Sequence, residues 1–287
     1  PYLYLLPALI TIGLWIYKPL VETFQLSFYQ WNLIPTSPQT YVGLQNYERI
    51  LTLPEMGQAI VNTVIYIVGL LPLSVALPLI VAIFTENISR RWRNIYRTLI
   101  FVPMIMAPVV VSVVWRWILH PSQGVLNVQL SQWLGTDPIN FLRDGALPIL
   151  TIIFITSWKL VGFSTLIFSA AIANVNRDYI EAASIDGASY WQTVRYILIP
   201  LLSPTILFLT TLSVLLASQW TFAYINVLTQ GGPLGATTNV YYILWEFGFR
   251  SFAIGWSSAA AMVMFVGFGL LAALLLGLTR RYSFFDN

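Results

Sequence analysis

Residues 60–84 read IVNTVIYIVGLLPLSVALPLIVAIF, a run that contains no charged side chain. A helix needs about 20 mostly apolar residues to cross the hydrocarbon core of a bilayer. The run therefore predicts a membrane-spanning helix. Pro72 and Pro78 lie inside it, and each removes a backbone donor, so they predict kinks in this span.

The composition of the whole chain agrees with this stretch. Of 287 residues, 57% are hydrophobic and 9% are charged, and the mean hydropathy is +0.75. A typical soluble domain carries about 25% charged residues. The 14 Lys and Arg and 11 Asp and Glu cannot cover a water-facing surface of this size. The chain is therefore predicted to be an integral membrane protein, not a soluble enzyme, a disordered chain or a nucleic-acid-binding module.

The scarce reactive residues narrow the chemistry further. The chain has no cysteine and one histidine, His120, so we expect no disulfide, no metal site and no catalytic residues. The two lysines, Lys18 and Lys159, each follow an aromatic residue, whereas a phosphate-binding P-loop needs a glycine before its lysine. If ATP drives this protein, another subunit must bind it.

Five further stretches are long and apolar enough to span a bilayer. They are residues 2–26, 99–119, 147–173, 199–228 and 252–278. The sequence thus predicts an all-α membrane protein with six transmembrane helices in a single domain over residues 1–287. The first stretch is too long for a cleaved signal peptide. Because the chain begins with Pro1, we expect a short N-terminal piece to precede it.

Arginines are unevenly distributed between the two sets of span ends. Eight follow the second, fourth and sixth spans, against three after the first, third and fifth. The eight are Arg90, Arg91, Arg93, Arg97, Arg177, Arg195, Arg280 and Arg281. Loops rich in Lys and Arg stay in the cytoplasm. Both termini and the loop at residues 174–200 are therefore predicted to be cytoplasmic.

The loop at residues 174–200 has its own helical pattern. Asp178, with Glu181 three residues later, is typical of a capped helix start, and Gly187 predicts its end. A second amphipathic helix is predicted over 189–199, ended by Pro200 and Pro204. A helix-turn-helix of this kind suits docking into a groove of a cytoplasmic partner. From composition alone, an ordinary connecting loop is an equal alternative.

The spacing of particular residues in this loop resembles a known family. Glu181-Ala182-Ala183, Gly187 and Ile199-Pro200 look like the EAA loop of bacterial ABC importer permeases, with Ile199 where that pattern has Leu. Asn176 stands where many relatives have Pro, and we expect Asp178 to cap the helix instead. The resemblance implies a coupling helix that docks into the ATPase subunit. It assigns docking to Glu181, Ala182, Ala183, Asp186 and Gly187.

Further motifs extend the resemblance to the carbohydrate-uptake branch of these permeases, and to the first-subunit type of maltose permease. They are Gly43-Leu-Gln-Asn-Tyr47, Arg97-Thr-Leu-Ile-Phe-Val-Pro103, Trp115 with Gly124 and Asn127, and Leu228-Thr-Gln-Gly-Gly-Pro233 with Ala236-Thr-Thr238. The resemblance implies a type I importer domain in the inner membrane. It implies a second permease subunit, two ATPase subunits that bind ATP and Mg²⁺, and an extracytoplasmic solute-binding protein. This chain would carry no cofactor and catalyse no reaction.

Polar residues within spans are candidates for the substrate route. Lys159 lies halfway along the fourth span beside Trp158, and it either lines the route, or snorkels or pairs with a backbone carbonyl. The fifth span contains Ser218, Trp220 and Thr221, and sugars bind where hydroxyls or amides lie beside aromatic rings. In the resemblance to maltose permease, Trp158 and Phe163 match aromatic contact positions, and Ser218 and Thr221 replace asparagines.

Other charges near span ends have simpler interpretations. Arg116 is expected to extend its side chain to the outer interface, and Lys18 and Glu22 are expected to pair as i, i+4 neighbours. Two other functions stay open: an ABC importer for another small solute, and a secondary carrier or channel that acts alone. A carrier usually places a carboxylate near the bilayer midplane. Every Asp and Glu here lies in a loop or near a span end.

Overall fold

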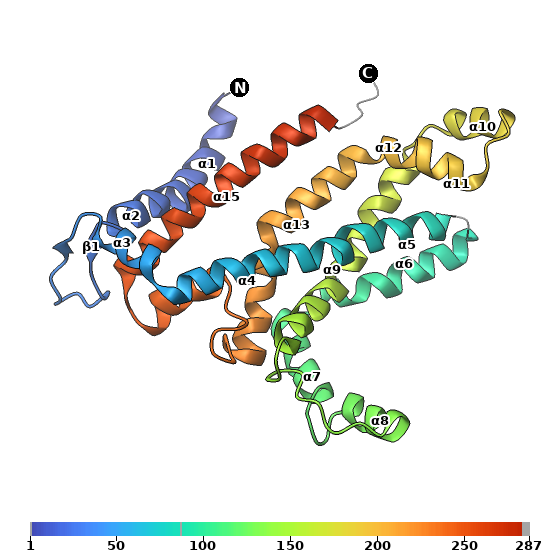
Figure 1. Cartoon of the computed structure of the whole chain (residues 1–287). Coiled ribbons are helices and arrows are strands. Elements are labelled where there is room, and N and C mark those ends of the chain that lie inside the picture. Colours follow the sequence, from blue (N-terminus) through green and yellow to red (C-terminus); the bar gives the residue numbers. More distant parts are fainter. Residues whose placement is uncertain (1, 87, 283–287) are drawn as a thin grey trace. The chain divides into compact units, whose positions relative to one another are not determined.

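The computed structural model describes residues 2–86 and 88–282. These residues are mostly helical, with one two-stranded sheet among the described parts (Figure 1). The chain divides into two compact units. Unit 1 comprises residues 1–61 and 238–270, and unit 2 comprises residues 62–237 and 271–287.

Unit 1 begins with an apolar helix whose side chains are largely exposed, as expected for a helix that faces lipid. The elements of the unit are α1 (Tyr2–Ile12), the π-helical turn η1 (Gly13–Tyr17), α2 (Lys18–Leu26), β1 (Tyr29–Gln30), β2 (Thr40–Tyr41), α3 (Gln45–Thr52), the start of α4 (Pro54–Leu71), α14 (Val240–Trp245), η5 (Glu246–Arg250) and the first part of α15 (Ile254–Tyr282). The predicted pair of Lys18 and Glu22 is confirmed, with 3.8 Å between Nζ and Oε1.

In the short sheet of unit 1, Tyr29 pairs antiparallel with Tyr41, and the core of the unit is formed by α3, α4, α14 and α15. Its buried members are Ile50, Met56, Ala59, Val240, Ile243, Ala259 and Ala260. The Nδ2 of buried Asn46 donates to the Ser27 and Tyr29 carbonyls at 2.9 and 3.0 Å. These bonds satisfy polar groups of the chain that leaves α2, so that segment is fixed against α3.

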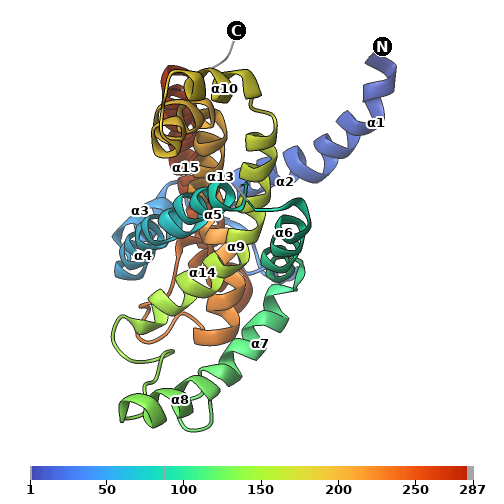
Figure 2. The same ribbon diagram turned by 90° about the vertical axis from the view of Figure 1, so that its right-hand side faces the viewer.

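Unit 2 is built around the long helix α9. Its elements are the rest of α4, η2 (Pro72–Ala76), α5 (Leu77–Glu86), α6 (Arg90–Ile105), α7 (Pro108–Ile118), α8 (Val125–Leu134), α9 (Leu147–Ala173), α10 (Arg177–Ile185), α11 (Tyr190–Thr193), η3 (Val194–Leu198), α12 (Ile199–Leu201), α13 (Ser203–Tyr224) and η4 (Ile225–Thr229). Helices α5, α6 and α13 all pack against α9. Within unit 2, α7 and α8 lie at one end and α10 lies at the other (Figure 1, Figure 2).

The predicted spans agree with the helices in number and approximate position. Among the described residues, five helices are long and apolar enough to cross a membrane, and a bent pair makes a sixth if it counts as one span. The predicted bounds 2–26 and 147–173 match the helical segments, and the second span is longer than predicted, at Pro54–Glu86. The fifth and sixth candidates are Ser203–Thr229 and Ile254–Leu278. Within the second, a π-helical turn begins at Pro72, because proline supplies no N–H to the helical ladder.

The third span is not the single continuous helix that the sequence predicts for residues 99–119. Its two helices, Arg91–Ile105 and Pro108–Ile118, meet at 96°. Met106 and Ala107 between them are extended, with ψ of 136° and 132°. The helical conformation is sterically disfavoured for a residue that precedes proline, which accounts for the extended conformation of Ala107 before Pro108. The bend also needs a donor for the freed carbonyl groups, and α9 supplies one.

Candidate functional site

The loop at residues 174–200 folds into a helical hairpin, as predicted, but a different residue caps its first helix. The Asn176 Oδ1 accepts a hydrogen bond from the Asp178 backbone N–H at 3.1 Å, and Asn176 is the N-cap of α10. The expectation that Asp178 caps this helix is therefore wrong. Asp178 lies within the first turn, where its charge favours the positive end of the helix dipole.

Gly187 ends α10 as the sequence predicts. Its φ is +78°, and the Gly187 and Ala188 amides donate to the Ser184 and Ala183 carbonyls at 3.1 and 2.9 Å. This pair of bonds is a Schellman motif, which satisfies carbonyls that the end of a helix leaves free. A left-handed residue is needed at this turn, and glycine adopts that conformation without a steric cost.

The second helix begins at the predicted place and continues beyond the predicted end. Ser189 and Gln192 form a reciprocal capping box, in which the Ser189 amide donates to the Gln192 Oε1 at 2.7 Å. Helical structure then runs through η3 and α12 to Leu201. The prediction that Pro200 ends the helix is wrong. Pro200 lies in the first turn of α12, directly after the π-helical turn η3.

The second helix of the hairpin is anchored to the spans. The Tyr190 hydroxyl donates to the Ile83 carbonyl at 3.4 Å, and the Trp191 ring packs edge-on against Phe84 at 5.8 Å. Further along, η3 contributes to the apolar core of unit 2. That core consists of Val75, Ala82, Ile83, Phe168, Ile172, Val194, Leu198, Leu202 and Leu209. The hairpin is therefore held against α5 and α9 from one side.

The first helix, α10, exposes most of the residues that the sequence assigns to docking. Glu181, Ala182, Asp186 and Gly187 are exposed, whereas Ala183 is buried with 7% of its surface accessible. Ile185 is 87% exposed, an unusual position for a large apolar side chain in a polar loop. Sequence reasoning missed Ile185, and its position between Ser184 and Asp186, next to the predicted helix end at Gly187, was the available signal.

Lys159 is buried on α9 and fixes the bend of the third span. Its Nζ donates to the Met106 carbonyl at 2.8 Å. A carbonyl partner for Lys159, which the sequence allowed, is therefore present. One turn further along α9, Gly162 faces α6: a Cβ on it would lie 2.2 Å from the Ile100 carbonyl oxygen. The backbones of α6 and α9 thus approach so closely that only a glycine fits at position 162.

The aromatic candidates on α9 lie in two different surroundings. Trp158 is 38% exposed and packs edge-on against Trp115 of α7 at 5.9 Å. Phe163 is half-buried and packs against the apolar core of unit 2. Trp158 is therefore the more exposed of the two.

The candidates on α13 lie inside the helix bundle. Thr221 is fully buried, and its hydroxyl donates to the Ala217 carbonyl at 2.9 Å. Ser218 is also buried, Trp220 is half-buried, and the neighbouring Gln219, which sequence reasoning passed over, is exposed. Helices α9 and α13 pack against each other. The two sets of candidates thus belong to neighbouring spans.

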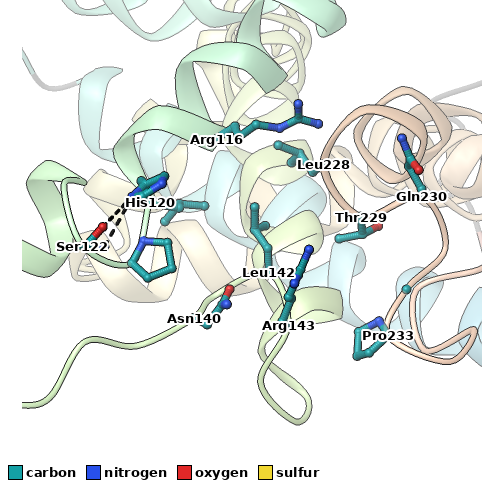
Figure 3. Close-up of a pocket in the computed structure, with 13 residues that line it drawn as sticks. Arg116, His120, Ser122, Asn140, Leu142, Arg143, Leu228, Thr229, Gln230 and Pro233 are labelled. Carbon is teal, nitrogen blue, oxygen red and sulfur yellow. Dashed lines mark hydrogen bonds between the residues drawn. The ribbon is translucent and has the colours of Figure 1, made fainter.

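A cavity of about 920 Å³ lies at the end of unit 2 that carries α7. Figure 3 shows Arg116, Arg143 and Gln230 around it, each from a different segment of the chain. The lining also includes five residues of the predicted Leu228–Pro233 motif: Leu228, Thr229, Gln230, Gly232 and Pro233. The six route candidates are not part of this lining.

Long apolar helices with an anchored helical hairpin in one loop define a polytopic membrane protein. The model of the binding-protein-dependent transport system inner membrane component family matches residues 74–282. The chain belongs to this family of ABC importer permeases, and it is a multi-pass protein of the inner membrane.

Individual relatives cover almost the whole chain. A probable ABC transporter permease protein of Pyrococcus horikoshii is 33% identical, over 98% of this chain and 94% of the relative. The arabinooligosaccharides transport system permease protein of Halalkalibacterium halodurans is 26% identical, over 98% and 86%. Crystal structures of a bacterial ABC transporter that imports the acidic polysaccharide alginate match at 26% identity over 98% of this chain. For the transporter, the TM-score is 0.85 and 94% of that chain is covered. For its complex with an alginate-bound periplasmic protein, the TM-score is 0.83 and 93% of that chain is covered. These matches confirm the predicted type I importer fold.

Proposed function

We propose that this chain is the permease subunit of an ATP-driven importer for a sugar, oligosaccharide, polyol or related polyhydroxy solute. The names of the relatives support the solute class, since they include an arabinooligosaccharide permease and an alginate importer. The exposed indole of Trp158 suits the flat CH faces of sugars, and the neighbouring span α13 carries the hydroxyl side chains of Ser218 and Thr221. An importer for another small solute is the nearest alternative.

The importer would contain several other chains. A second permease subunit would complete the route, and two ATPase subunits would bind ATP and Mg²⁺, so this chain itself would catalyse no reaction. An extracytoplasmic binding protein would deliver the solute. The family description and the alginate complex with its periplasmic protein support this last partner.

The observation that carries the proposal is the two-sided helical hairpin. Its α11–η3 side is packed into the chain, while its α10 side exposes Glu181, Ala182, Asp186 and Ile185. An apolar side chain that is 87% exposed next to acidic residues suits a cleft in a partner protein. With the excess of arginines on the same side, we place α10 and both termini in the cytoplasm. ATP binding would move α10, and the spans would alternate between inward-open and outward-open states.

The substitution Ile185→Asp tests the docking role. It places a second carboxylate beside Asp186 at an interface that excludes water, so we expect it to lower retention of the ATPase subunits at least tenfold. Leu234→Asp is the matched control, because Leu234 is also a fully exposed apolar residue, and it directly follows Pro233 of the cavity lining, outside the hairpin. The measurement is the amount of ATPase that co-purifies with the tagged permease. Equal retention by both variants would contradict docking through α10.

The same preparation separates the proposal from a carrier that acts alone. Proteoliposomes that contain the complete complex should take up solute only when ATP is on the cytoplasmic side of the complex, in the vesicle lumen, and the binding protein is outside. Uptake by this chain alone, driven by a proton or sodium gradient, would support the carrier instead.

A further inference from the structure

The cavity at the α7 end of unit 2 is lined by cationic and amide side chains. Arg116 comes from α7, Asn140 and Arg143 from the segment before α9, and Gln230 from the segment after η4. Among the described residues that line the cavity, none is acidic. Its volume of about 920 Å³ is within the range of small-molecule pockets.

The positive charge of the cavity is not neutralised within the described part of the chain. No ion pair is formed there by Arg116 or Arg143. The nearest carboxylate in sequence, Asp144, accepts a hydrogen bond from the Asn140 backbone N–H at 2.9 Å and does not line the cavity. Arg116 lies in the last turn of α7, where the helix end carries about half a negative charge. That partial charge offsets less than one of the two guanidiniums.

The histidine of the cavity adds a further hydrogen-bonding group. The His120 Nδ1 accepts hydrogen bonds from the Ser122 and Gln123 backbone N–H groups, both at 3.3 Å. In the neutral ring the proton therefore lies on Nε2, which is free to donate. Figure 3 shows His120 and Ser122 on the side of the cavity away from Gln230.

Two buried polar side chains fix the walls of the cavity. Asn127 exchanges hydrogen bonds with the backbone of Ile139 at 2.9 and 3.0 Å, which holds the segment that carries Arg143. Thr237 bonds the Thr229 hydroxyl at 2.8 Å and the Gly232 carbonyl at 2.9 Å, which holds the opposite wall. The cationic groups are thus mounted on ordered segments and form a site without large rearrangement.

We infer that this cavity binds the anionic group of an acidic saccharide as the solute enters the importer. Two guanidiniums supply the charge and the forked donors that a carboxylate or phosphate group prefers. The amides of Asn140 and Gln230 suit sugar hydroxyls. The inference rests on the proposed importer function and specifies its solutes as anionic carbohydrates.

The test is uptake by the complete reconstituted complex, with wild-type chain or with R116Q/R143Q. The probes are oligouronides of two to four sugars and the same oligomers with every carboxyl group methyl-esterified, which removes the charge and keeps the size. We expect the double variant to raise the half-saturating concentration of the acidic oligomers about tenfold and to leave that of the esters unchanged. R91Q is the matched control, because it removes an exposed guanidinium that lies outside the cavity lining.

Each outcome has a distinct meaning. If the double variant raises the half-saturating concentration equally for acidic and esterified oligomers, the inference is overturned. The arginines would then serve delivery by the binding protein and not recognition of the charge. Transport of neutral saccharides alone would also overturn it, although the proposed importer function would stand. If ATP drives uptake of no saccharide at all, the proposed function itself fails. Size-exclusion profiles and ATPase content of the variant establish that it is assembled.

Discussion

Gly162→Ala tests the close packing of α6 on α9 most directly. A Cβ at this position would lie 2.2 Å from the Ile100 oxygen and 2.8 Å from the Ile100 carbon and the Phe101 Cα. All three are backbone atoms, so no side chain can rotate to make room. The backbone of α6 must move away by about 1 Å before the contact becomes an ordinary van der Waals contact.

The free energy of this change follows from opposing contributions. Alanine stabilises a helix by about 1 kcal/mol relative to glycine. Overpacking against the backbone costs about 3 kcal/mol, at the upper end of such effects. The hydrogen bond from Lys159 to Met106, one turn away, would stretch beyond bonding distance and cost about 1–2 kcal/mol more. The expected net loss of stability is about 3–4 kcal/mol.

Thermal denaturation of the purified complex in detergent measures this loss. At roughly 2–4 °C per kcal/mol, the apparent Tm of Gly162→Ala should fall by about 6–16 °C. Gly269→Ala is the matched control in a helix, because a Cβ there meets nothing within 4 Å. Gly69→Ala should be intermediate, because its nearest neighbour, at 2.6 Å, is the flexible end of Ile153. An unchanged Tm for Gly162→Ala would refute the close approach of the two backbones.

Three further substitutions test local structure. Lys159→Met should lower the apparent Tm by leaving the Met106 carbonyl without its donor, a loss of about 1–3 kcal/mol; an unaltered Tm would contradict a structural role for this bond. Asn127→Ala should speed amide hydrogen exchange at Ile139 about tenfold, and unchanged exchange would show that Asn127 does not hold this segment. Asn176→Ala should cost about 1 kcal/mol at the start of α10 and speed exchange there, whereas Asp178→Asn should have little effect. The reverse order would identify Asp178 as the cap.

The apolar spans were predictable because their signal is local. A bilayer accepts only helices whose backbone groups are bonded internally, so length and hydropathy together decide the assignment. The bounds 147–173 were predicted for this reason, since Pro148 suits a helix start and polar residues follow Ala173. Gly187 was predictable for a similar reason, because the turn it makes depends on its own φ.

The bend of the third span was not predictable from its own residues. An apolar run with prolines at 103 and 108 is also compatible with a kinked continuous helix. The break depends on Lys159, more than 50 residues later in the chain, which supplies the donor for the Met106 carbonyl. The cavity was not predictable for the same reason: Arg116, Arg143 and Gln230 are distant in sequence and come together only through folding. Sequence reasoning accordingly treated Arg116 alone, as a residue that reaches the interface.

The long helix α9 connects the hairpin to the bent span. At one end, Phe168 and Ile172 share the apolar core with Val194 of η3. Further along, Lys159 and Gly162 hold α6. At 1.5 Å per residue, the 27 residues of α9 extend about 40 Å. A close-packed helix of this kind transmits displacement, because packed interiors do not deform continuously.

This connection predicts how two variants combine. Ile185→Ala weakens the contact through which a partner would move the hairpin, and Lys159→Gln weakens the contact through which α9 would move the bent span. If both act in one mechanical sequence, the double variant should take up solute no more slowly than the slower single variant. Initial uptake rates in proteoliposomes with equal amounts of assembled complex are the measurement. Multiplied losses would show that Lys159 acts independently of the hairpin, as a group that contacts the solute would.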